Sequence, residues 1–114
     1  MKRGIKSFAR SIRDGDVERS EELLDKVVQG RLSASEWGGY RMALKGMIGS
    51  FSSNNEMTLA QQIYEGKFGR HKVENFFEVF SLKASQSFRP EKEIGFNLAW
   101  SQVLEVILKD IKEE

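Results

Sequence analysis

The chain of 114 residues contains no cysteine, one histidine and one proline. Without cysteine there can be no disulfides, no thiol chemistry and no thiolate metal sites. The single imidazole, His71, cannot build a zinc site of the histidine type on its own. Because Pro90 is the one proline and no stretch sustains an alternation of period two, we expect helix throughout the chain.

Long hydrophobic runs are missing as well. No apolar stretch approaches the roughly 20 residues that a membrane helix needs. The basic first residues are interrupted by charge every few positions, so they lack the continuous apolar core of a signal peptide. The 18 basic and 17 acidic residues leave a net charge of +1, which gives no overall attraction to nucleic acid or membrane. We therefore expect a cytoplasmic protein with no membrane partner, folded as one domain over residues 1–114.

Apolar spacing and capping signals predict an all-α fold of four to six helices in antiparallel hairpins. The predicted helices cover about residues 2–13, 17–29, 34–51, 56–67, 73–84 and 91–111. Asp16 is well suited to cap the second helix, and Ser33 with Glu36 forms a capping-box pattern before the third. The residues expected to face inward from the first two helices are Ile5, Phe8, Ala9, Ile12, Val17, Leu24, Val27 and Val28.

The fifth predicted helix has the cleanest pattern, with apolar residues at i, i+3, i+4, i+7 and i+11. These residues are Val73, Phe76, Phe77, Phe80 and Ala84. Aromatic stripes at this spacing usually belong to a core, and the lining of a ligand pocket is the alternative.

The final predicted helix carries apolar residues on two faces. One stripe consists of Phe96, Trp100, Val103, Leu104, Ile107 and Ile111, and the second of Ile94, Leu98 and Leu108. A helix that is apolar over more than one face must be wrapped by other helices or shared with a second subunit. We therefore predict a homodimer with shared or exchanged helices, in which 52–55 or 85–90 would act as the hinge of an exchanged hairpin.

The third predicted helix contains four glycines, which together cost on the order of 4 kcal/mol relative to alanine. Its small residues, Gly39, Ala43, Gly46 and Ser50, fall on one face, almost opposite the large residues Trp37, Leu44, Ile48 and Phe51. The small face predicts close approach of another backbone, and a break of the helix at Gly38 and Gly39 is the alternative. The predicted interface residues are Phe96, Trp100, Leu104, Ile107, Leu108, Gly39 and Gly46.

Charge is distributed unevenly between the first two helices. The first is basic and the second strongly acidic, which favours a self-complementary hairpin over a nucleic-acid or membrane surface. A second basic cluster precedes the aromatic stripe. The residues that could contact an anion are Lys6, Arg10, Arg70, His71 and Lys72.

The acidic second helix places Glu18, Glu22 and Asp25 at i, i+4 and i+7, with Glu21 close by. In this it is similar to the acidic helix motif of the all-α nucleotide pyrophosphatases, which implies magnesium and pyrophosphate chemistry. Those enzymes complete the site with a second acidic helix. The best candidates here, Glu74 and Glu78, lack a third carboxylate. We therefore expect a solvated outer face, with no metal, no cofactor and no catalytic residue.

In its size, lack of cysteine, charged surface and helical pattern the whole chain resembles small uncharacterised all-α protein families of archaea. Some of these form dimers with exchanged helical hairpins, and the resemblance implies no activity. We predict a non-catalytic interaction or assembly protein whose partner is itself or an unidentified protein. Nucleic-acid binding through the basic first helix and magnesium-dependent nucleotide hydrolysis are the alternatives.

Overall fold

The computed structural model describes residues 4–51 and 58–112, and within these ranges the chain forms six α-helices and no strand. The helices are α1 (Ile5–Arg13), α2 (Val17–Leu24), α3 (Ala34–Gly49), α4 (Leu59–Tyr64), α5 (Arg70–Ala84) and α6 (Glu91–Lys112). The prediction of an all-α fold is confirmed. The start of the predicted first helix (2–3), the predicted hinge at 52–55 and the start of the predicted fourth helix (56–57) lie outside the described residues.

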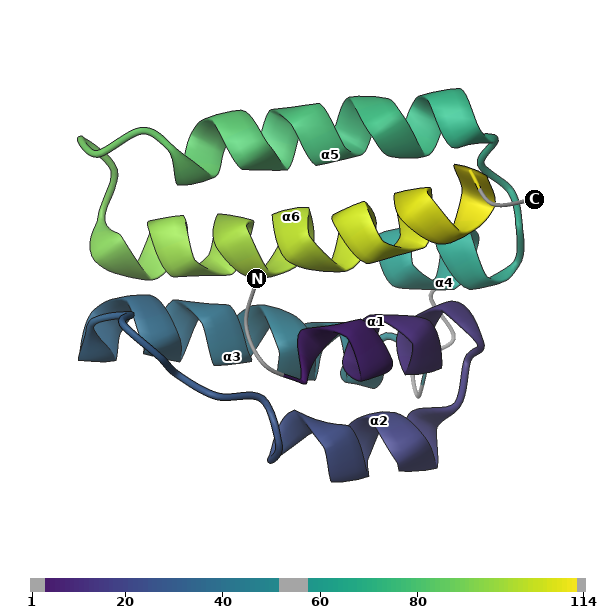
Figure 1. The fold of residues 1–114 in the computed structure, drawn as a ribbon, viewed down its shortest axis with the longest axis horizontal. Helices are drawn as coiled ribbons and strands as arrows, with labels where there is room; N and C mark the ends of the chain where they lie inside the picture. The colour runs from purple at the N-terminus through teal and green to yellow at the C-terminus, as the bar shows by residue number, and fades with distance from the viewer. Residues whose placement is uncertain (1–3, 52–57, 113–114) are drawn as a thin grey trace.

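The long helix α6 lies in the middle of the molecule (Figure 1). On one side α5 runs along it in the opposite direction, and on the other side lie α1 and α3, with α2 beyond them. The two apolar stripes of the final helix are therefore covered largely by helices of the same chain, as its composition requires.

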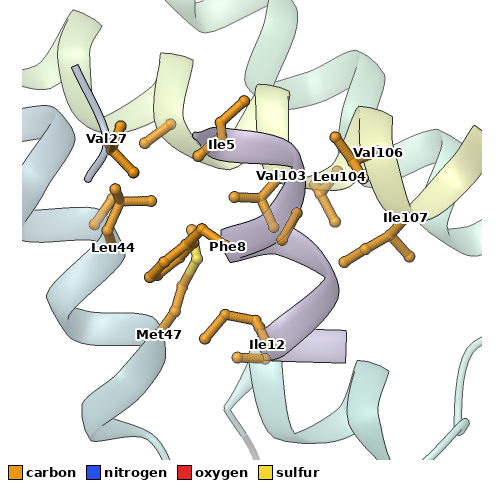
Figure 2. Close-up of a cluster of buried hydrophobic side chains, with 14 of the residues drawn as sticks. Ile5, Phe8, Ile12, Val27, Leu44, Met47, Val103, Leu104, Val106 and Ile107 are labelled. Carbon is orange, nitrogen blue, oxygen red and sulfur yellow. The ribbon is translucent and has the colours of Figure 1, made fainter. Parts of the chain in front are cut away.

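The apolar face of α1 fills the space between α3 and α6. Ile5, Phe8, Ala9 and Ile12 are buried, as predicted. Figure 2 shows Ile5, Phe8 and Ile12 among side chains that converge from three other segments. The labelled partners are Val27, Leu44, Met47, Val103, Leu104, Val106 and Ile107.

Helix α3 is continuous through its glycines, so the alternative of a break at Gly38 and Gly39 is wrong. Its predicted capping box is confirmed. The Ser33 hydroxyl accepts a hydrogen bond from the Glu36 backbone N–H (3.1 Å), and a Glu36 carboxylate oxygen accepts one from the Ser33 N–H (2.8 Å). These two bonds satisfy amide groups that the first turn of a helix otherwise leaves unpaired.

The glycines of α3 and α6 allow the two helices to pack in close contact. A Cβ atom added at Gly39 would lie 1.8 Å from the carbonyl oxygen of Lys92, and one added at Gly95 would lie 1.8 Å from the carbonyl oxygen of Glu36. The predicted close approach of a backbone to the small face of α3 is therefore made within the chain. Further along, Tyr40 is fully buried and donates a hydrogen bond from its hydroxyl to Gln102 Oε1 (2.7 Å), and burial raises its pKa.

Helix α2 is shorter than predicted, ending at Leu24 rather than near Gln29. The Asp16 cap is confirmed, since its side chain accepts from the Arg19 N–H. After Leu24 the chain turns, and this turn buries Val27 but leaves Val28 45% exposed. The prediction that Val28 faces inward was wrong because it assumed a continuous helical register.

The stripe on α5 is only partly a core stripe. Val73 is buried, whereas Phe76, Phe77 and Phe80 are half-buried. Because α5 lies at the edge of the molecule and packs mainly against α6, one neighbouring helix cannot cover all of its aromatic rings.

Candidate functional site

The predicted interface residues divide into two groups. Four of them, Gly39, Leu104, Ile107 and Leu108, are covered by the chain's own helices. The other three remain at the surface: Phe96 and Trp100 are half-buried, and Gly46 is exposed with open space where a side chain would be. Of the predicted interface residues, the second group alone is therefore accessible to a second folded copy.

Phe96 and Trp100 line a surface groove together with Gly46 and Met42. We call these four residues the aromatic groove. Phe96, Trp100 and Gly46 border a hollow of about 330 Å³, whose far wall includes Leu59 and Ala60 of α4. Phe96 and Met42 border a neighbouring hollow of about 510 Å³ beside Pro90, Lys92 and Glu93. Because Phe96 lines both hollows, they adjoin each other at this side chain.

The walls of the aromatic groove are largely apolar. Trp100 stacks on Phe80 of α5, with ring centroids 5.5 Å apart and an angle of 15° between the planes. Met42 is 46% exposed. A tryptophan held by a neighbouring ring, beside an adaptable methionine, is typical of surfaces that bind proteins.

The basic residues of α1 bind an acid that the sequence did not single out. The Arg10 Nε and Nη2 atoms each lie 3.2 Å from an oxygen of Asp110, and Arg13 Nη1 binds the same carboxylate. The hydrogen bond from Arg10, with the positive charges of Arg10 and Arg13, lowers the pKa of Asp110. Asp110 lies within α6, which continues to Lys112.

This ion pair also changes the predicted partner of the basic helix. Asp110 on α6 binds the two arginines, where the sequence favoured the acidic residues of α2. Arg10 also lines a polar depression whose other charged residues are Arg19, Asp14 and Asp16. A lining of mixed sign offers less attraction to a run of phosphates than a uniformly basic face would.

The other predicted anion contacts lie on different surfaces. Lys6 is exposed on α1, and Arg70, His71 and Lys72 are exposed in the first turn of α5. Arg70 makes a long ion pair with Glu74 (3.9 Å), and Lys72 lies over the ring of Phe68 (5.1 Å to its centroid). Arg70 and Arg13 line one cavity. Their spacing in the sequence could not show that the fold brings these two side chains to the same place.

The two acidic helices required by the hydrolase alternative do not meet. Helix α2 packs on α1 and α3, and α5 lies on the opposite side of the molecule (Figure 1). Across 4–51 and 58–112, no three acidic or histidine side chains come close enough to hold a metal ion. The carboxylates Glu18, Glu21, Glu22 and Asp25 are exposed on the outer face of the molecule.

Comparisons with known proteins do not identify a family for this chain. No family model, curated protein or solved structure matches the chain. Among the described helices, none is long and apolar enough to cross a membrane. The resemblance to small archaeal families stays a prediction.

Sequence reasoning missed Met42 and Asp110. Met42 sits on the same side of α3 as Gly46, one turn earlier, which was a usable signal. Asp110 follows Val103 and Ile107 at spacings of seven and three, so helical geometry already placed its carboxylate on the buried face of α6.

Proposed function

We propose that this protein is a non-catalytic assembly module that forms a homodimer through the aromatic groove. The observation that carries the proposal is the pair of largely apolar hollows that adjoin at Phe96, one bordered by Trp100 and the other by Met42. Covering such a surface removes apolar area from water, which is the main driving force of protein association.

Charge at the edge of the groove supports a second copy as the occupant. Lys92 and Glu93 border the hollow next to Phe96. In a two-fold symmetric interface each copy presents the same patch, so Lys92 of one copy can approach Glu93 of the other twice. With a net charge of +1, two copies also meet without strong mutual repulsion.

The proposed dimer joins two folded copies and does not exchange helices between them. Leu104, Ile107 and Leu108 are already buried by helices of their own chain. Exchange of a hairpin would rebuild these same contacts in the dimer without covering the aromatic groove, so it adds no apolar burial there.

The test is light scattering with size-exclusion chromatography over a range of micromolar concentrations. We expect a mass of about 26 kDa, twice the 13.1 kDa of one chain. The double variant Met42→Lys/Gly46→Lys should run as a monomer. Both positions are exposed, and nothing lies within 4 Å of a Cβ at Gly46, so the fold should tolerate both changes.

A matched control separates groove occupation from a general loss of surface apolarity. Val28 is as exposed as Met42, at 45% against 46%, and lies on the turn after α2. Val28→Lys should therefore remain dimeric. A mass near 13 kDa for the wild-type protein at every concentration, or a dimer that survives the double substitution, would refute the proposal.

A further inference from the structure

A separate cavity lies near the C-terminal end of α6, away from the aromatic groove. It encloses about 360 Å³, which is at the small end of the range for ligand sites of about 300–1,000 Å³. No residue that borders it also borders the aromatic groove. Its lining residues come from α1, α4, the turn before α5, α5 and α6.

The walls of this cavity are apolar. They consist of Ile63, Phe68, Val73, Ile107 and Ile111, with the backbone of Gly66 and Gly69 between them. Phe68 is fixed by a ring contact with Phe76, with centroids 5.4 Å apart. A small hydrocarbon group bound here would move from water into an apolar environment, which lowers its free energy.

Two arginines line this cavity, and they differ in how firmly ion pairs hold them. Arg13 is held by two acids, with Nη1 on Asp110 and Nε 3.1 Å from Asp14. Arg70 is 52% exposed, and its ion pair with Glu74 spans 3.9 Å, the outer limit for such a contact. Arg70 can therefore turn to an incoming anion with little loss, while Arg13 cannot.

We propose that this cavity binds a small monocarboxylate with an apolar tail, such as a medium-chain fatty acid. The tail would fill the space between Ile63, Val73 and Ile107. The carboxylate would stay at the mouth, where the planar guanidinium of Arg70 can donate two parallel hydrogen bonds to it. The side chains between the two arginines are apolar, which favours a hydrocarbon tail over the polar body of a sugar or a nucleoside.

The test uses octanoate and the uncharged 1-octanol as a matched pair of probes. Both are titrated into the full-length protein below their aggregation limits, and binding is followed by amide chemical shifts. Octanoate should bind saturably and about fivefold more tightly than octanol, a modest ratio because water screens a half-exposed ion pair. The shifts should map to residues around the cavity and not to the aromatic groove.

Two variants and a control assign the roles of the residues. Arg70→Gln should weaken octanoate about fivefold and leave octanol unchanged, since it removes the charge contact alone. Ile111→Trp, at a half-buried position on the cavity wall, should abolish binding of both probes while the helical circular dichroism persists. Arg31→Gln, an exposed arginine after α2, should change neither affinity.

Equal affinity for octanol and octanoate, no effect of Arg70→Gln, or the absence of saturable binding at millimolar octanoate would each overturn the assignment. The outcome is independent of self-association. Met42→Lys/Gly46→Lys should bind octanoate as the wild-type protein does, whether or not it is a monomer.

Discussion

Substitution of Gly39 by alanine probes the tightest contact in the fold. The added Cβ would lie 1.8 Å from the Lys92 carbonyl oxygen, whereas ordinary contact needs about 3.4 Å or more. The helices must therefore separate locally by about 1.6 Å. The atom in the way belongs to the backbone, so rotation of a side chain cannot relieve the overlap.

The magnitude follows from two opposing terms. Alanine improves helix propensity over glycine by about 1 kcal/mol, while overpacking typically costs about 1–3 kcal/mol. The reciprocal contact of Gly95 with Glu36 would be disturbed as well, and α3 with α6 forms the largest helix pair of the fold. We expect the cost at the upper end of that range, so Gly39→Ala should lower the free energy of unfolding by about 2 kcal/mol.

The adjacent glycine supplies the control. Nothing lies within 4 Å of a Cβ at Gly38, which is exposed in the same helix. Gly38→Ala should therefore raise the free energy of unfolding by about 1 kcal/mol. Urea denaturation followed by circular dichroism, at one fixed protein concentration, measures both variants. If Gly39→Ala proved as stable as Gly38→Ala, the close helix contact described above would be wrong.

Two further predictions concern ion pairing and capping. Asp110→Asn should lower the free energy of unfolding by about 1 kcal/mol at pH 7, because two arginines lose their charged partner. Since the pKa of Asp110 is lowered in the folded protein, its contribution is fully present above the ordinary carboxyl pKa of about 3.9 and is lost progressively as pH falls from there through the lowered pKa of the folded protein. The difference in the free energy of unfolding between wild type and variant should therefore be smaller at pH 3 than at pH 7, while Asp25→Asn, at an 82% exposed side chain, should show little difference at either pH. A gap of equal size at pH 3 and pH 7 would contradict the assignment to Asp110. Ser33→Ala removes the side chain of the capping box and should lower the free energy of unfolding by about 1 kcal/mol, which thermal melting measures. The control is Ser35→Ala, at an exposed position in the same turn, and it should melt close to wild type.

Local signals were sufficient for most of the helices. The capping box at Ser33, the Asp16 cap and the apolar face of α1 depend on residues within a few positions of one another, so the sequence contains them in full. The end of α2 was missed for the opposite reason. Val27 lies outside the helix and is buried in the core. The free energy gained by burying it depends on core residues that lie far along the chain.

The candidate site was predictable only as a list of residues. Phe96 and Trp100 were recognised from their spacing, but the same pattern also selected Leu104 and Ile107, which are buried. The cavity near α6 was not recognisable, because Arg13 and Arg70, which both line it, lie far apart in the sequence and on different helices. Spacing reports which residues share a helix face, and it does not report which neighbours cover that face.

The apolar stripe on α6 shows both what the sequence determines and what the tertiary structure decides. The sequence by itself determines that Phe96, Trp100, Val103 and Ile107 share one side of a helix, because 3.6 residues make a turn wherever that helix lies. Tertiary structure alone decides that Val103 and Ile107 meet α1 and become core, while Phe96 and Trp100 remain as the wall of a groove. The physical reason is that burial is a property of the surfaces that meet: α1 ends at Arg13, against the C-terminal half of α6, and leaves the aromatic part of the same stripe only partly covered.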